Sequence, residues 1–170
     1  MVTKADFTAE EWQRILSLPQ VASLYLALAS PSNPLGLAQE MIASTKGIVE
    51  ALKTSSGNEL IDAVAADIRE KAEKRERMEP PLKRSNDLNE MKAQCLQACR
   101  DVAALLSQKA PADSQAYKQW VYQAAHNSAN AAKEGGIFGI GGERISEAEA
   151  AALQDIATAL DIPVSSPGGV

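Results

Sequence analysis

Apolar residues recur three and four positions apart along most of the chain, which is the spacing of an α-helix and not of a β-strand. The first helix is expected to begin at Ala9. Thr8 and Glu11 form a capping box at this point, in which each side chain pairs with the backbone amide of the other residue. Phe7 and Trp12 occupy the two positions of a hydrophobic staple, so two separate signals predict the same helix start.

A second helix is predicted directly after the first. Ser17 and Gln20 repeat the capping pattern around Pro19, and proline is favoured in the first turn of a helix because the amide that it lacks would be unpaired there. This helix is expected to run to about Ala29. Its stretch VASLYLALA, residues 21–29, is apolar on almost every side, which is typical of a helix at the centre of a bundle.

Two further helices are expected before the middle of the chain. The prolines and the glycine of PSNPLG, residues 31–36, end one helix and redirect the chain. Helical spacing resumes at residues 37–53 and again at residues 59–78. The second of these helices ends in the charged run REKAEKRER, which we interpret as a solvated helix end with Glu70 and Lys74 as an ion pair one turn apart.

Three more helices are expected in the second half. The segment EPPLKRSND, residues 79–87, is the best candidate for a mobile linker, and Asp87 with Glu90 caps the helix that follows it. The three helices are expected at residues 87–109, 114–134 and 147–160. The side chains predicted to face inward are Leu88, Met91, Cys95, Ala98, Val102 and Leu105 in the first, Tyr117, Trp120, Val121, Ala124, Ser128 and Ala131 in the second, and Leu153, Ile156, Ala157 and Leu160 in the third.

A glycine-rich segment, GGIFGIGGERISEAE at residues 135–149, joins the last two helices. Five of its first eight residues are glycine, which favours positive φ angles or close backbone approach. Ser146 and Glu149 then form a capping box that opens the last helix. The last two helices are therefore expected to form a hairpin closed by this loop.

In total the pattern predicts an all-α, single-domain bundle of about seven helices at residues 1–162, followed by a disordered tail at residues 163–170.

Composition narrows the class of function. With 45% hydrophobic but only 4% aromatic residues, the core must be built mainly from small and aliphatic side chains, and 170 residues suit one domain. The net charge of −5 argues against nucleic-acid binding, because contact with phosphates needs a basic face. Two cysteines fit a reducing compartment, and neither a signal peptide nor a membrane-spanning run is apparent. The sequence therefore predicts a cytoplasmic protein.

Cys95 and Cys99 are the candidate ligands for a metal. They lie four residues apart on one helix, so that both thiols lean the same way, and they form a weak candidate for a soft metal site or a redox pair. The only histidine, His126, is placed by helical geometry opposite Tyr117, on the far face from the apolar stripe. A metal would need more ligands than this, so buried cysteines acting as small hydrophobes are the favoured interpretation.

The glycine loop suggests a second weak candidate, an anion site at Arg144 and Ser146, because the amides at a helix start can hold a phosphate. The pattern lacks the GK[ST] sequence and the preceding strand of a nucleotide-binding loop, and Glu143 brings the wrong charge. A calcium loop is not expected, because Phe138, Ile140 and Gly142 would stand where oxygen ligands are needed. The sequence singles out no catalytic residues and no cofactor.

Three stretches resemble known families. FTAEEWQRILSLPQ near the start, and AYKQW and AAKEGGIFGIGGERISEAEAAAL near the end, resemble a group of small bacterial helical proteins without an assigned activity, with FTxEEW and GGERxSxxE as the shared motifs. ISEAEAAALQDIATAL is also similar to the last helices of tellurite-resistance TerB-like domains, which are acidic helical bundles. The resemblance implies an all-helical fold and assigns no functional residues.

Two classes of function follow as expectations. The first is a non-enzymatic cytoplasmic protein that acts through a helical surface, by binding a protein partner or by self-association. The alternative is a stress-related bundle of the TerB-like kind that binds a small ligand or a metal in its interior, with Cys95, Cys99 and the Tyr25 hydroxyl as the polar groups available.

Overall fold

A computed structural model describes residues 2–29, 57–76, 78–134 and 146–163. These residues contain five α-helices, a short 3-10 turn and no strand, so the all-α prediction is confirmed. In chain order the elements are η1 (Lys4–Asp6), α1 (Ala9–Ala29), α3 (Glu59–Glu73), α4 (Leu88–Lys109), α5 (Pro111–Glu134) and α6 (Glu147–Ala159). The expected count of seven is not matched: two of the predicted helices are one, and the helix predicted at residues 37–53 lies outside the described residues, as do the glycine loop and residues 164–170.

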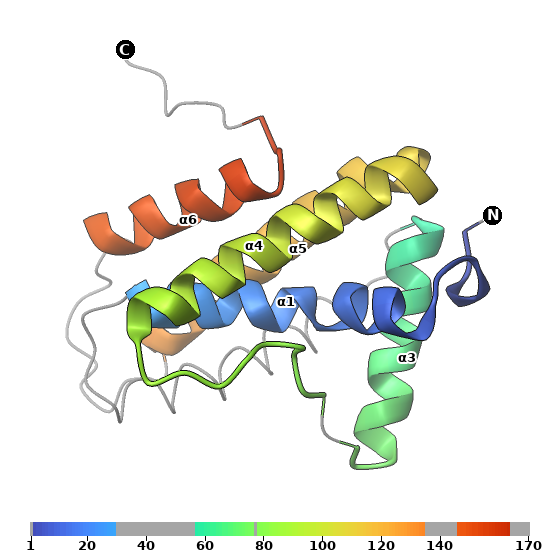
Figure 1. Cartoon of the computed structure of the whole chain (residues 1–170), viewed down its shortest axis with the longest axis horizontal. Coiled ribbons are helices and arrows are strands. Elements are labelled where there is room, and N and C mark those ends of the chain that lie inside the picture. The colour runs from blue at the N-terminus through green and yellow to red at the C-terminus, as the bar shows by residue number, and fades with distance from the viewer. Residues whose placement is uncertain (1, 30–56, 77, 135–145, 164–170) are drawn as a thin grey trace.

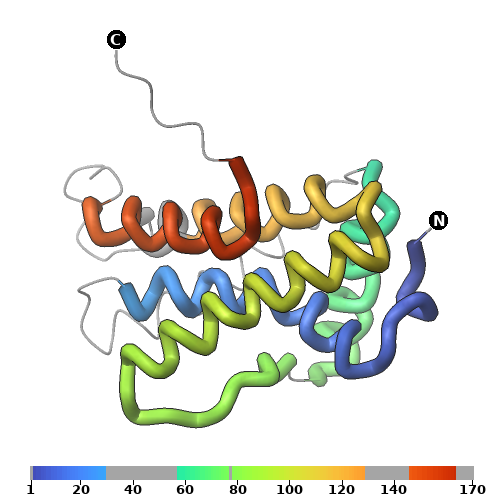
Figure 2. Tube along the Cα trace, turned by 45° about the horizontal axis from the view of Figure 1, so that its top comes forward, coloured from blue at the N-terminus to red at the C-terminus, as the bar shows by residue number. Residues whose placement is uncertain are grey.

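Helix α1 lies at the centre of the bundle and packs against α3, α4, α5 and α6 (Figures 1 and 2). Helices α4 and α5 follow one another as an antiparallel hairpin, α6 lies alongside both of them, and α3 crosses the end of α1 that is near the N-terminus. The expectation that the apolar stretch at residues 21–29 is central is confirmed for Val21, Ala22, Tyr25 and Leu26, which are buried.

The start of α1 matches its prediction. The Thr8 amide donates to the Glu11 carboxylate over 2.8 Å, and the Glu11 amide donates to the Thr8 hydroxyl over 3.2 Å. Phe7 and Trp12 pack against each other with ring centroids 5.9 Å apart. The capping box and the staple are therefore both present, and together they fix the direction in which the chain enters the helix.

The predicted break at Ser17 is wrong, because α1 continues through Pro19 as one helix. A proline inside a helix has no amide to give to the carbonyl four residues earlier, here that of Ile15. In this structure the Tyr117 hydroxyl of α5 donates to the Ile15 carbonyl over 2.5 Å and replaces the missing donor. Ser17 is not a cap, since its hydroxyl donates backwards to the Gln13 carbonyl over 2.8 Å.

The inward face of α4 is rotated from the predicted stripe. Leu88 is 61% exposed, while Cys99, Ala103 and Leu106 are buried beside the correctly predicted Cys95 and Val102. The Asp87 side chain caps the helix by accepting from the amides of Asn89 and Glu90. The predicted reciprocal contact is absent, because the Glu90 carboxylate accepts instead from the Ser85 hydroxyl over 2.6 Å.

Helix α5 begins at Pro111, three residues before the predicted start at Ser114. Pro111 is the first helical residue, a position that suits proline, and the Ala110 carbonyl accepts from the amides of Asp113 and Ser114. The predicted inward residues Tyr117, Val121, Ala124 and Ser128 are buried, and Trp120 is half-buried.

Helix α3 ends earlier than its pattern predicts. It was expected to reach Met78, but it ends at Glu73, and Arg75 takes a left-handed conformation with a φ of 56°. The amides of Arg75 and Glu76 donate to the carbonyls of Ala72 and Lys71, which is the Schellman arrangement that closes a helix. The predicted ion pair between Glu70 and Lys74 is present at 2.5 Å.

The segment at residues 79–87 makes specific contacts with two helices. The Lys83 amide donates to the Gln94 side chain over 2.7 Å, the Gln94 amide group donates back to the Lys83 carbonyl over 3.2 Å, and Gln13 of α1 donates to the Glu79 carbonyl. Leu82 packs against the core. Whether the segment is mobile stays a prediction.

Candidate functional site: the thiol pair and the Asp67 anchor

The two cysteines lie one turn apart on the buried face of α4, and neither has any exposed surface. This placement agrees with the interpretation of both residues as small hydrophobes in the core. It also brings the two sulfur atoms onto one face of one helix, as the metal and redox hypothesis requires. Their position alone therefore favours neither hypothesis over the other, and their chemistry depends on their surroundings.

The surroundings hold both thiols in the protonated form. Burial raises the pKa of the Cys95 thiol to about 11. The pKa of Cys99 is raised to about 12, first by burial and then by the neighbouring Cys95. Because the thiolate is the form that attacks electrophiles and binds metals, both cysteines are unreactive near neutral pH.

Two tyrosines lie near the thiol pair. The Tyr25 hydroxyl of α1 donates to the Asp155 carboxylate of α6 over 2.6 Å, while the Tyr117 hydroxyl is used by the Ile15 carbonyl. The pKa of Tyr25 is raised, mainly by burial and then by the hydrogen bond to Asp155, with smaller contributions from both cysteines. Burial also raises the pKa of Tyr117, with a smaller contribution from Cys99. The hydroxyls thus serve as structural donors between helices.

Further ligands for a metal are not gathered at the thiols in the part of the chain that the structure describes. No group of three or more His, Cys, Asp or Glu side chains converges there in a way that suits a metal ion. His126 is half-buried on α5.

Of the two residues of the predicted anion site at the start of α6, the structure describes only Ser146. The Ser146 amide donates to the Glu149 carboxylate over 2.8 Å, and the Glu149 amide donates to the Ser146 hydroxyl over 3.2 Å, so the predicted capping box is confirmed. The Ser146 hydroxyl also lies 2.9 Å from the same carboxylate oxygen. A carboxylate of the chain itself therefore lies at this helix start and brings a negative charge to it. Arg144 lies outside the described residues, and the anion site stays a prediction.

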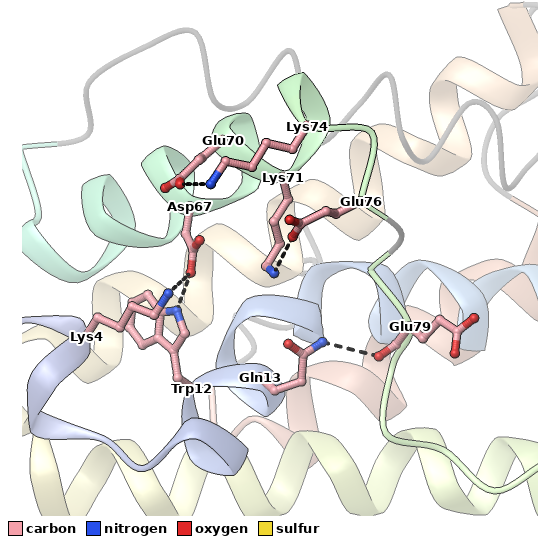
Figure 3. Close-up of polar contacts among 9 residues, drawn as sticks. All are labelled: Lys4, Trp12, Gln13, Asp67, Glu70, Lys71, Lys74, Glu76 and Glu79. Carbon is pink, nitrogen blue, oxygen red and sulfur yellow. Dashed lines mark hydrogen bonds and ion pairs between the residues drawn. The ribbon is translucent and has the colours of Figure 1, made fainter.

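Asp67 of α3 forms a charged contact that the sequence did not indicate (Figure 3). Its Oδ2 atom accepts from the Trp12 indole Nε1 over 2.6 Å and from the Lys4 ammonium over 2.9 Å. Asp67 is only 8% exposed. Burial acts to raise the pKa of this carboxyl, but the bonds from Trp12 and Lys4 and the charge of Lys71 outweigh it, so the pKa lies below its ordinary value of 3.8. The carboxylate is therefore charged at neutral pH and joins η1, α1 and α3.

A second charged contact joins the same end of the molecule to α4. The Lys109 ammonium lies 2.6 Å from the Glu11 carboxylate and 5.8 Å from the centre of the Phe7 ring. The hydrogen bond from Lys109 is the main cause of the lowered pKa of Glu11. The start of α1 is thus held from two sides, by α3 through Asp67 and by α4 through Lys109.

Only a search along α3 for a buried acid could have found Asp67 in the sequence. It falls on the apolar face of the helix, between Val64 and Ile68, where an acidic residue needs a partner. The partners Lys4 and Trp12 are 63 and 55 residues away, so no local pattern names them.

None of the helices in the described part of the chain is both long enough and apolar enough to cross a membrane. No protein-family model, no curated protein and no solved structure matches the chain. The likeness of its two ends to a bacterial helical family and to TerB-like domains therefore stays an expectation from the sequence.

Proposed function

We propose that this chain is a non-enzymatic, cytoplasmic helical protein that acts by binding a protein partner or a second copy of itself. One observation carries the proposal: both thiols and two tyrosine hydroxyls of the core are held by the fold in unreactive or hydrogen-bonded states. Both thiols have raised pKa values, and the Tyr25 and Tyr117 hydroxyls donate to groups on neighbouring helices. Side chains held in this way stabilise a scaffold, and catalysis would need them to be released first.

The surface offers one place where such contact could be centred. Leu88, at the first position of α4, is 61% exposed and is the large hydrophobic residue that stands out from the described surface. Leu82 and Met91 are half-buried nearby in the sequence. An exposed apolar side chain at a helix start is a common anchor for a protein contact, although a single one gives a small interface.

Native mass spectrometry of the purified protein tests the proposal, because one spectrum reports the number of subunits and any retained ligand. We expect a dimer, or a complex with a protein partner, without a bound small molecule. Leu88→Lys should weaken that association by roughly tenfold or more. Ala104→Lys places the same charge at another exposed position of α4 and serves as the matched control. Turnover of a small substrate would refute the proposal, and so would a monomer that binds no protein.

The second candidate is a soft-metal or ligand-binding bundle. The observation that favours it is the shared, fully buried face of Cys95 and Cys99 with Tyr25 close by. This second candidate predicts, in the same spectrum, a mass above that of the polypeptide alone. The added mass should disappear in the double variant Cys95→Ala, Cys99→Ala. Val102→Ala, which perturbs the same helix face without removing sulfur, should keep the excess. A mass excess that survives the double variant would exclude the thiols as its ligands.

A further inference from the structure

Ser114 and Lys118 are two buried polar side chains of α5 that share one face of the helix. Ser114 is 5% exposed and Lys118 is 4% exposed. They lie four residues apart, so their Cβ atoms are neighbours at about 5–6 Å on the helix surface. Among the residues that the structure describes, the Ser114 hydroxyl has no hydrogen-bond partner, and no ion pair includes Lys118. A hydroxyl and a cation thus lie side by side without a role in the described fold.

The Ser114 hydroxyl differs from the other buried serine hydroxyls of the described helices. Those of Ser17, Ser23 and Ser128 each donate to the carbonyl four residues earlier. For Ser114 that carbonyl belongs to Ala110, and it already accepts from two backbone amides, at 2.9 and 3.1 Å. Because both lone pairs of that oxygen are taken, the Ser114 hydroxyl remains free to donate elsewhere.

The positive charge of Lys118 is not balanced by the nearest acid before it on α5. The Asp113 carboxylate accepts from the Asn58 side chain of α3 over 2.9 Å. Asp113 lies five residues before Lys118, which places the two about 140° apart around the helix. The first turn of α3 carries Glu59 and Asp62, which have contacts of their own. A cation with so little exposed surface is costly without a counter-charge, so an anion at this place would stabilise the fold.

Both side chains lie in the first two turns of α5, where this helix meets the start of α3 (Figure 2). The bond between Asn58 and Asp113 holds these two helix starts together. The start of a helix carries a partial positive charge, which adds to the charge of Lys118. The surroundings of Ser114 and Lys118 therefore favour a negatively charged ligand.

We propose that Ser114 and Lys118 bind a small carboxylate ion. Its two oxygen atoms can accept from the ammonium and from the hydroxyl at the same time. Its single negative charge balances the single charge of Lys118, whereas phosphate or sulfate would bring a second negative charge close to Asp113. The site does not depend on the function proposed above. A small ion held by two side chains exchanges with the buffer, so a native mass spectrum without a bound small molecule agrees with it.

Nuclear magnetic resonance of the full chain tests the site directly. The protein is titrated with sodium acetate, while sodium chloride is lowered to keep the ionic strength constant. We expect the backbone amide signals of Ser114 and Lys118 to shift and to saturate, with a Kd of about 1–10 mM for acetate. Sodium phosphate at the same ionic strength should bind at least tenfold more weakly, because its second charge is not balanced.

Two variants assign the binding to these side chains. Lys118→Met keeps an unbranched side chain of similar length and removes the charge, so the saturating shift should disappear. Ser114→Ala removes one hydrogen bond to a charged ligand and should raise the Kd about tenfold. Lys92→Met is the matched control, because it makes the same change at a half-buried lysine of α4 and should leave the Kd unchanged. If Lys118→Met does not fold, Ser114→Ala, which loses only a hydroxyl, decides the question.

Four outcomes would overturn the proposal. Shifts that do not saturate in the parent chain would show that water alone satisfies the Lys118 ammonium at the tip of its stem. An unchanged Kd in Ser114→Ala would remove the hydroxyl from the site. An equal loss of binding in Lys92→Met would mean that acetate responds to the overall charge of the protein. Tighter binding of phosphate than of acetate would contradict a site for a singly charged ion.

Discussion

Pro19 leaves the carbonyl of Ile15 without its usual helical donor, and the Tyr117 hydroxyl supplies one from a different helix. Both ends of this bond are buried, since neither Ile15 nor Tyr117 has exposed surface. A buried acceptor left unpaired costs about 1–3 kcal/mol, which is enough to decide whether a helix continues or breaks. We therefore infer that this hydroxyl offsets part of the cost of continuing the helix through Pro19.

This role predicts the effect of removing the hydroxyl. Tyr117→Phe should lower the free energy of unfolding by about 1–2 kcal/mol, because the Ile15 carbonyl loses its donor. In a Pro19→Ala background the restored amide can serve that carbonyl, so the same substitution should cost clearly less. Urea unfolding of the four chains measures the coupling.

Tyr122→Phe is the matched control for that cycle. Tyr122 lies on the same helix and is half-buried, and it should lose little stability on the same change. Equal costs for Tyr117→Phe with and without Pro19 would show that the hydroxyl does not compensate for the proline.

At the residue level, the contacts that could be predicted from the sequence are those between residues within one or two helical turns of each other. The capping boxes of Thr8 with Glu11 and of Ser146 with Glu149 are present because both partners lie within one helical turn. The partners of Tyr117 and Asp67 could not be named, because they lie 102 and more than 50 residues away. Their pairing depends on how helices pack, which a local pattern does not contain.

At the scale of elements, the errors have two causes. The ends of α3 and α6 could not be read from the sequence, because the residues that close these helices are not glycine. Arg75 and Asp161 take positive φ angles after α3 and α6, at 56° and 55°. The inward face of α4 was misplaced because Leu88 was counted as core, although it is exposed in the first turn. The predicted inward residues of α6 are all buried, and so are those of α5 apart from the half-buried Trp120 and Ala131, whose side chain lies outside the described part of the structure.

The left-handed residue after α3 predicts an unusual gain from glycine. Arg75→Gly should stabilise the protein by about 0.5–1 kcal/mol, because a side chain at positive φ is strained and glycine is not. Arg69→Gly changes the same residue type inside the same helix and should destabilise by about 1 kcal/mol. Thermal unfolding of both variants checks the opposite signs. A loss of stability in Arg75→Gly would show that this helix end is not closed as described.

At the scale of the whole molecule, the buried thiols make stability depend on alkaline pH. Their pKa values are about 11 and 12 in the folded chain, against an ordinary value of 9.0. A raised folded pKa stabilises the fold below the ordinary value and loses that effect as the pH rises towards the folded one. Stability should therefore fall by about 1 kcal/mol or more between pH 9 and pH 10.

Denaturant unfolding at those two pH values measures the effect. The double variant Cys95→Ala, Cys99→Ala should show a much smaller fall, because it keeps the tyrosines and lysines and loses only the thiols. The window ends at pH 10 to limit the contribution of tyrosine and lysine side chains, which titrate near pH 10 in the unfolded chain, and the double variant keeps these groups as the reference. A fall of the same size in both chains would assign the effect to other groups.

The class of fold was predictable at this scale because helical spacing pervades the chain. The central place of α1 followed from its apolar stretch. The crossing of α3 over its start did not, since it brings together residues more than 50 positions apart, such as Trp12 and Asp67. The buried apolar core could thus be predicted better than the charged contacts that join the start of α1 to α3 and α4.

The bond between Tyr117 and Ile15 also sets an order of events during synthesis. The start of α1 is made first, but the donor that lets it pass Pro19 follows 102 residues later. At about 5–20 residues per second, the ribosome takes some 5–20 seconds to add that stretch. During this interval the Ile15 carbonyl has no Tyr117 hydroxyl to pair with. We therefore expect α1 to be less stable around Pro19 in a nascent chain that lacks α5 than in the complete chain.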